Sequence, residues 1–298
     1  MKWVPESLQT WLQKKLKGIV LDGLPSAPLK YLPNKPWYYS YMVPKTADPG
    51  IEQARDGLSV PPLDLRCGYG RGDTEQYLLS GVEDVEVLMK LLAESDFSLS
   101  DGHRVLDFGC AGGRMIRCLR EYANECEIWG VDVSASHILW CKAHLSPPFH
   151  FATTTTVPHM PFPDAFFDVV YAGSVFTHVD DLTDAWLLEL RRILAPGGRF
   201  YCTIHDNRTM TLLDGALRGH WLADMLHKNA AYKNKRDDIG MLVIGRNTDA
   251  QVFYDLAHFR KTLDSTFQVL SVTEEAYSFQ TGILASPRTE VNASRGAV

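Results

Sequence analysis

Several features that define whole classes of protein are absent from this sequence of 298 residues. No apolar stretch approaches the roughly 20 residues of a membrane-spanning helix, and residues 1–6 lack the apolar core of a secretion signal. No dense run of lysine or arginine occurs, and the net charge is −6. Because nucleic-acid backbones are bound by clustered cations, this charge disfavours a nucleic-acid partner. We therefore expect a cytoplasmic protein with neither a membrane nor a nucleic-acid partner.

Cysteine is scarce and irregularly spaced. No Cys-x-x-Cys pair occurs among the six cysteines, which are Cys67, Cys110, Cys118, Cys126, Cys141 and Cys202. This spacing excludes a disulfide or zinc framework and is typical of reduced packing residues. The sequence shows no cluster of metal ligands and no internal repeat, so we expect no metal. Its hydrophobic content of 45% is sufficient to bury the core of one large domain.

The most informative positive feature is a pair of short apolar segments that are separated by a glycine-rich turn. Residues 105–108 are predicted to form a buried strand that leads into the turn, and a helix is predicted over residues 115–122. A second strand, residues 127–131, ends in the carboxylate of Asp132. This order is typical of the nucleoside-binding half of a doubly wound sheet. The acid is placed to accept hydrogen bonds from both hydroxyls of a ribose.

The order of residues in the turn distinguishes between nucleoside cofactors. A dinucleotide site requires Gly-x-Gly-x-x-Gly, so that a pyrophosphate rests on the helix N-terminus. Here the turn reads Asp107-Phe-Gly109-Cys-Ala111-Gly-Gly113, with a carboxylate two residues before the first glycine. An acid at that place repels a pyrophosphate but suits a ligand that carries an ammonium and a sulfonium group.

At these residues the chain resembles the class I S-adenosylmethionine-dependent methyltransferases of the type 11 kind, whose first motif is acid-x-Gly-x-Gly-x-Gly. Residues 160–168 are similar to the approach to strand four in that family, and residues 196–198 resemble its Pro-Gly-Gly junction before strand five. The resemblance covers roughly residues 80–285. It implies an α/β fold, a Rossmann-like doubly wound sheet of seven mostly parallel strands. Ala111 departs from the motif, since it stands where the middle glycine is usual, and implies weaker cofactor binding at most.

The resemblance also implies which residues bind S-adenosylmethionine. The glycine turn would lie beside the methionine part, Asp132 would bind the ribose, and Thr155 or Thr156 occupies the place from which the adenine is contacted. The threonine run is equally explained by strand propensity. The full predicted set is Asp107, Gly109, Cys110 (through its backbone), Ala111, Gly113, Asp132, Val133, Thr155, Thr156 and Ser174.

Candidate catalytic residues follow the predicted fourth and fifth strands, residues 167–172 and 199–204. Because the sulfonium already activates the methyl group, catalysis mainly requires alignment of the acceptor, and an oxygen acceptor also benefits from a general base. We hypothesise that His205, beside Asp206, is this base, with His178 as the second candidate. Two structural alternatives stay open. His178 could hydrogen-bond the chain at a helix start, and His205 could order the following loop or contact the substrate.

Three regions lie outside the common core of the expected methyltransferase domain, residues 80–285. Residues 1–79 are rich in proline and aromatic residues and are predicted to form an N-terminal arm or lid, which could be exchanged between subunits of a homodimer. Residues 206–252 are an insertion, and residues 286–298 are expected to be a disordered tail. The arm contains the aromatic cluster Trp37, Tyr38, Tyr39 and Tyr41, which either contacts the substrate or packs the arm onto the domain.

The acceptor is predicted by exclusion. The chain has Gly173-Ser174-Val175-Phe176 where many base-amino methyltransferases have Asn/Asp-Pro-Pro-aromatic. With the acidic charge, this favours a small-molecule substrate: a sugar or metabolite hydroxyl first, and a small amine or sulfur acceptor next. The chain looks like bacterial methyltransferases of glycans or secondary metabolites. Two alternatives are a non-catalytic S-adenosylmethionine-binding scaffold protein and, less favoured, an NAD-dependent oxidoreductase.

Overall fold

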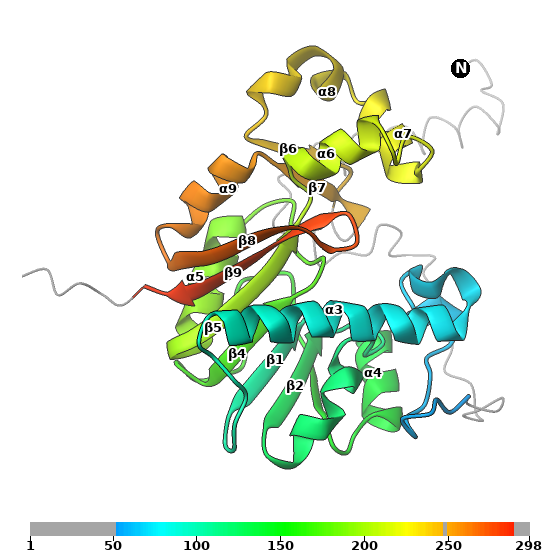
Figure 1. The fold of residues 1–298 in the computed structure, drawn as a ribbon, viewed down its shortest axis with the longest axis vertical. Coiled ribbons are helices and arrows are strands. Elements are labelled where there is room, and N and C mark those ends of the chain that lie inside the picture. The colour runs from blue at the N-terminus through cyan, green and yellow to red at the C-terminus, as the bar shows by residue number, and fades with distance from the viewer. Residues whose placement is uncertain (1–51, 247–248, 289–298) are drawn as a thin grey trace, which may run out of the picture. The chain divides into compact units, whose positions relative to one another are not determined.

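A computed structural model describes residues 52–246 and 249–288 of the chain. Seven strands in these residues form one sheet in the order β3-β2-β1-β4-β5-β9-β8 (Figure 1). Strands β1 to β5 are parallel, whereas β9 runs antiparallel to both β5 and β8. The strands are β1 (Arg104–Phe108), β2 (Glu127–Asp132), β3 (His150–Thr153), β4 (Phe167–Ala172), β5 (Leu194–Ile204), β8 (Phe267–Tyr277) and β9 (Gln280–Pro287). The predicted seven-stranded, mostly parallel sheet is confirmed.

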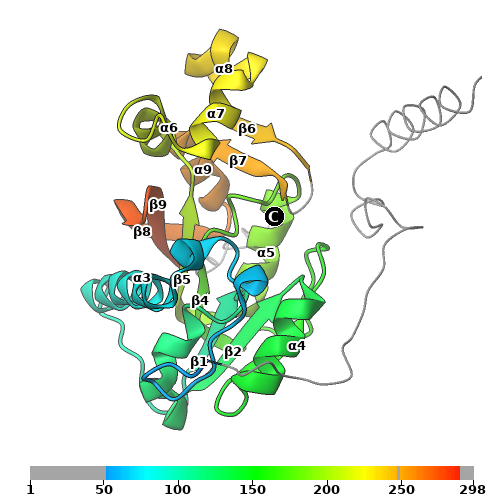
Figure 2. The same cartoon turned by 90° about the vertical axis from the view of Figure 1, so that its right-hand side faces the viewer.

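Both faces of the sheet are covered, which explains the nearly continuous apolar runs in its central strands. Val105 of β1 packs in a cluster with the helical segments α3 (Thr74–Glu94), η3 (Ile116–Asn124) and α4 (Ala135–His144). The next residue, Leu106, points to the opposite face and packs with α5 (Thr183–Ile193) and α9 (Leu256–Leu263). Figure 2 shows α3 and α5 on opposite sides of the central strands.

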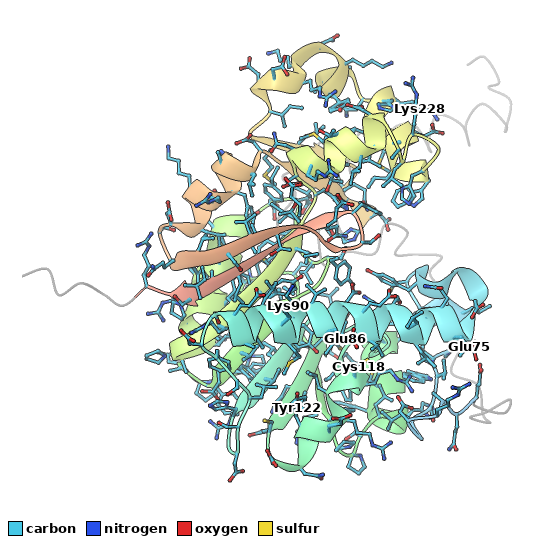
Figure 3. The ribbon with its side chains drawn as sticks, viewed as in Figure 1. Glu75, Glu86, Lys90, Cys118, Tyr122 and Lys228 are labelled. Atoms are coloured by element: carbon cyan, nitrogen blue, oxygen red, sulfur yellow. The ribbon has the colours of Figure 1, made fainter. Side chains whose placement is uncertain are left out.

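Helix α3 begins at Thr74, inside the range that was expected to form the N-terminal arm, residues 1–79. The Asp73 side chain caps it by accepting a hydrogen bond of 3.0 Å from the backbone N–H of Gln76. An acid followed three residues later by glutamine is a sequence signal for such a start. Figure 3 shows Glu75, Glu86 and Lys90 along α3, and all three side chains are exposed.

The segment after the glycine turn is a 3-10 helix, η3, rather than the regular helix expected there. Its Arg117 is 2% exposed and donates two hydrogen bonds of 2.9 Å to the carboxylate of Asp56. It also donates to the carbonyl oxygens of Leu58, at 3.2 Å, and Ser59, at 3.0 Å. Arg117 therefore fixes residues 56–59 against η3.

Residues 52–72 thus pack on the sheet domain and belong to the same compact unit as the sheet. Two short 3-10 turns, η1 (Leu63–Leu65) and η2 (Tyr69–Gly72), lie in this segment. The aromatic cluster Trp37, Tyr38, Tyr39 and Tyr41, the rest of the expected arm up to residue 51, and residues 289–298 lie outside the described residues. The predicted arm and tail therefore stay predictions.

The expected insertion forms a small lobe of its own, in the upper part of Figure 1. It consists of α6 (Asn207–Asp214), α7 (Trp221–Lys228), α8 (Ala230–Lys235), η4 (Arg236–Asp238), β6 (Met241–Ile244) and β7 (Gln251–Tyr254). A separate apolar cluster holds these elements together, and Phe253 of that cluster forms a parallel bridge with His205 at the end of β5. Across the described ranges, no helix combines the length and apolar character needed to cross a membrane.

The Arg117 contacts predict a measurable stability change. We expect Arg117→Lys to lower the free energy of unfolding by about 1–2 kcal/mol, because lysine cannot make the paired hydrogen bonds and leaves carbonyl groups without partners. The estimate is kept small because the Asp56 side chain is 34% exposed. Urea unfolding checks it, with Arg120→Lys as the control, since Arg120 is exposed and close by. Equal values for the two variants would contradict the role of Arg117.

Candidate functional site

The turn after β1 has a backbone that favours glycine. Gly109 has a φ of +86°, and a Cβ placed there would lie 2.4 Å from Cγ2 of Val175, so the loop after β4 packs directly on the turn. Ala111 also has a positive φ, 45°. The departure from the family motif therefore keeps the left-handed conformation that a glycine would adopt more easily.

Asp107, at the penultimate position of β1, is buried next to this turn. Its side chain is 3% exposed, and in the described part of the chain its Oδ2 atom has no hydrogen-bond partner. Burial raises the pKa of Asp107 to about 7. A buried carboxylate oxygen without a partner suits an incoming ammonium group, which would satisfy the oxygen and favour its ionised form.

Asp132, at the end of β2, is fixed between the glycine turn and the start of α4. Its Oδ2 accepts a hydrogen bond of 2.9 Å from the backbone N–H of Ala111, and its Oδ1 accepts one of 2.7 Å from that of Ser134. A carboxylate has about four lone-pair sites. Asp132 therefore keeps acceptor capacity for ribose hydroxyls.

The end of β3 provides hydroxyl groups on the side where an adenine is expected. Thr155 is exposed and interacts with Val157, whereas the Oγ1 atoms of Thr154 and Thr156 are buried without a partner among the described residues. Of the two predicted threonines, Thr156 thus offers the unpaired hydroxyl, and sequence reasoning missed Thr154. Val133 is exposed at the surface next to Asp132.

Two further predicted cofactor residues in the turn have structural contacts. The Cys110 side chain is buried, and its backbone N–H donates to the carbonyl of Val131 at 3.0 Å, parallel to the 2.8 Å bond from Gly109. A Cβ at Gly113 would lie 2.4 Å from the Leu145 side chain, which leaves no room for a larger residue there. These contacts hold the turn against β2 and the end of α4.

Ser174, after β4, belongs to a hydrogen-bond network that the sequence did not reveal. Its N–H donates to Oγ1 of Thr203 at 2.7 Å, and its hydroxyl lies 2.9 Å from Thr177 Oγ1. The Gln280 amide donates to Ser174 Oγ at 2.9 Å and accepts from Thr203 at 2.7 Å. The network fixes the loop after β4 relative to β5 and β9.

The candidate histidines lie at the expected strand ends in different surroundings. His205 is 3% exposed and lies between the rings of Phe253 and Phe279, with centroid distances of 5.1 and 5.7 Å. Burial, with His178 and His220 nearby, lowers the pKa of His205 to about 3, so its imidazole is neutral at physiological pH. His178 Nδ1 lies 2.8 Å from the carbonyl oxygen of Ala250, and burial lowers its pKa as well.

The predicted pair, His205 as general base with Asp206 as the acid that orients it, is not the arrangement that the structure shows. Asp206 caps α6, since its Oδ1 accepts hydrogen bonds from the backbone N–H groups of Arg208, at 3.0 Å, and Thr209, at 3.2 Å. His178 has the better geometry. If its Nδ1–H donates to Ala250, as a carbonyl partner requires, its Nε2 is left as an acceptor.

A buried arginine and two tyrosines complete the site, and none was predicted. Arg114 forms an ion pair of 2.7 Å with Asp84 and donates to the hydroxyl of Tyr277. Its guanidinium lies 4.0 Å above the ring of Tyr69, whose hydroxyl is 2.8 Å from that of Tyr277. A Cβ at Gly173 would lie 2.9 Å from the Tyr277 ring, which places Tyr277 against the end of β4.

Comparisons with known proteins agree with this arrangement. Residues 106–202 match the family model described as a methyltransferase domain. The chain is 28% identical over 135 residues to the malonyl-[acyl-carrier protein] O-methyltransferase of Hahella chejuensis. The aligned region covers 44% of this chain and 48% of that protein. It is 28% identical over 134 residues to the ubiquinone/menaquinone biosynthesis C-methyltransferase UbiE of Cupriavidus pinatubonensis, with 43% and 52% covered. The chain spans about half the length of these curated relatives.

Solved structures show the same fold. The PH0226 protein from Pyrococcus horikoshii OT3 aligns with a TM-score of 0.54 at 18% identity, over 74% of this chain and 95% of that one. At this identity the likeness concerns the fold alone. With the family match, these findings confirm the predicted resemblance to the class I S-adenosylmethionine-dependent methyltransferases and the Rossmann-like fold.

The surroundings of His205 predict its behaviour with pH. We expect the ring resonances of His205 in a nuclear magnetic resonance titration of the folded protein to stay unchanged from pH 8 to pH 5, because burial keeps the imidazole neutral. Exposed His258 is the internal control. An inflection of the His205 signals near pH 6.5 would contradict this account.

The same group links stability to pH. Its pKa in the folded state is depressed below the value of about 6.5 in an unfolded chain, so the unfolded state binds the proton first. The contribution of His205 is therefore fully present above about pH 6.5 and is lost as the pH falls toward 3. In His205→Gln this part of the acid destabilisation should be absent.

Proposed function

We propose that this protein transfers the methyl group of S-adenosylmethionine to a small-molecule acceptor. The observation that carries the proposal is Asp107, a buried carboxylate at the base of the glycine turn, one oxygen of which has no partner among the residues that the structure describes. Asp132 lies across the turn and is bonded to its backbone at Ala111. A cofactor that carries an ammonium group and a ribose satisfies both acids, which a pyrophosphate does not.

Each part of the cofactor has residues of suitable chemistry. Asp107 would hold the ammonium group, Asp132 the ribose hydroxyls, and Thr154 and Thr156 the polar edge of the adenine. The bound cofactor supplies a methyl group already activated by the positive sulfur. The chain aligns the acceptor and excludes water, with Ser174 and its network holding the loop on which the reacting groups meet.

The surroundings of β4 and β5 favour an acceptor hydroxyl on a sugar or small metabolite. Near these strand ends lie the neutral imidazoles of His178 and His205, a type of group that accepts a proton or a hydrogen bond from a hydroxyl. His178 is the better base, because its Nδ1 is oriented by Ala250. Amine or sulfur acceptors come next, and the relatives' names include both an O- and a C-methyltransferase.

The six cysteines, all within the described ranges, are free thiols. They support the cytoplasm as the place of action, since that compartment keeps thiols reduced.

Cofactor binding tests the two acids. We expect calorimetric titration to show binding of S-adenosylhomocysteine and none of NAD. Asp132→Asn should weaken binding about 10- to 100-fold, because hydrogen bonds to a charged group contribute roughly 1.5–3 kcal/mol. Asp264→Asn is the matched control: Asp264 is exposed beyond α9 and pairs with Arg288. Equal affinity of the two variants would contradict the assignment of Asp132.

A turnover assay separates an enzyme from a cofactor-binding scaffold. The purified chain is incubated with S-adenosylmethionine and a panel of sugars and small metabolites, and S-adenosylhomocysteine is quantified by mass spectrometry. Acceptor-dependent formation of this product supports the proposal. Tight binding without product from any acceptor of the panel would favour a scaffold protein.

A further inference from the structure

Cys67 differs from the other cysteines in its exposure and its neighbour. All six cysteines are within the described ranges; four are buried, Cys118 is half-buried, and Cys67 is exposed between η1 and η2. Its sulfur lies 3.7 Å from Nε2 of His137, in the first turn of α4. A thiol accessible to solvent is therefore in contact with an imidazole.

His137 lies between this thiol and the acid proposed to bind the ribose. Its Nδ1 is buried and lies 3.8 Å from Oδ1 of Asp132, too far for a hydrogen bond and close enough for an ion pair. The nearby Asp132 carboxylate, with a smaller effect from Cys67, raises the pKa of His137. A positive charge on this ring is therefore balanced by the carboxylate on one side.

A cation next to a sulfur atom stabilises the negative charge that the sulfur carries when cysteine acts as a nucleophile. The His137 ring lies between the Cys67 sulfur and the Asp132 carboxylate. Negative charge on either neighbour stabilises a positive charge on the ring. Exposure of Cys67 gives a reagent access to the sulfur, whereas the four buried cysteines are shielded.

Residues 61–67 also lie against the cofactor turn. A Cβ at Gly112 would lie 2.6 Å from the carbonyl oxygen of Leu65 and 3.2 Å from Cγ of Pro61. Cys67 follows two residues later and contacts His137, which is next to Asp132. A group added to its sulfur would therefore lie beside the place assigned to the ribose.

We propose that Cys67 is a reactive thiol, activated by His137, and that its modification by a peroxide or an alkylating agent blocks the cofactor site. The blocking rests on the proposed function, whereas the reactivity of the thiol does not. With a peroxide, the thiolate attacks one oxygen, an S–O bond forms and the O–O bond breaks. The sulfur is oxidised to a sulfenic acid, the peroxide is reduced, and the departing hydroxide takes the imidazolium proton to give water.

Alkylation with iodoacetamide tests the reactivity. The thiolate displaces iodide, so an S–C bond forms while the C–I bond breaks, and peptide mass mapping follows each cysteine of the full chain at neutral pH. We expect Cys67 to react about tenfold faster in the folded protein than in urea, and to return to the urea rate in His137→Gln. Cys126, Cys141 and Cys202 should stay unlabelled in folded protein, which reports that the variant is folded.

Two results would overturn the activation: a folded rate at Cys67 no higher than the rate in urea, or an unchanged rate in a His137→Gln variant whose buried cysteines stay protected. His137→Lys adds a second test. If the cation next to the sulfur causes the reactivity, lysine should restore part of the rate that glutamine removes.

The affinity for S-adenosylhomocysteine tests the blocking. Alkylated wild-type protein should bind at least tenfold more weakly than untreated protein, whereas iodoacetamide treatment of Cys67→Ser should leave the affinity of that variant unchanged. Equal affinity of alkylated and untreated wild type would refute the blocking. If untreated protein fails to bind S-adenosylhomocysteine at all, the proposed function and the blocking both fail, and the alkylation rates still decide the reactivity.

Discussion

Arg114 and Arg117 bring two guanidinium groups into the protein interior just after the glycine turn, and the site depends on how they are paired. A buried charge is tolerated only with close partners. Arg117 obtains them from residues 56–59, while Arg114 obtains them from Asp84 of α3 and from Tyr277 of the β8–β9 hairpin. These contacts connect the turn to three parts of the chain, so that its position is set by all of them.

This pairing has a consequence for the chemistry proposed. Two acids, Asp107 of β1 and Asp132 of β2, flank the turn. His178 and His205, near the ends of β4 and β5, are neutral imidazoles. A cofactor with positive charge is attracted to the acids, and an uncharged acceptor meets surroundings that do not compete with it. Binding and alignment, rather than a strong base, would then supply most of the catalysis.

The parts of this structure that the sequence could predict are local. Residues 104–134 contain the strand, the turn, the second strand and its acid in one continuous pattern, and the fold class followed from them. The start of α3 has a local signal, Asp73 with Gln76 three residues later, but it was missed because residues 1–79 were assigned to an arm. The contacts of Arg114 with Tyr277 and of Cys67 with His137 join residues 163 and 70 positions apart, which no local pattern encodes. Asp206 has the neighbour expected of a catalytic acid, yet its hydrogen bonds cap α6.

The central claim is that Asp107 and Asp132 hold the two ends of one cofactor, and a crystal structure of the protein with S-adenosylhomocysteine tests it most directly. The account predicts that both ribose hydroxyls lie within hydrogen-bond distance, about 3 Å, of the Asp132 carboxylate. The amino group of the ligand should lie at a similar distance from Oδ2 of Asp107. A ligand bound elsewhere, or bound at the turn with its ribose away from Asp132, would contradict the account.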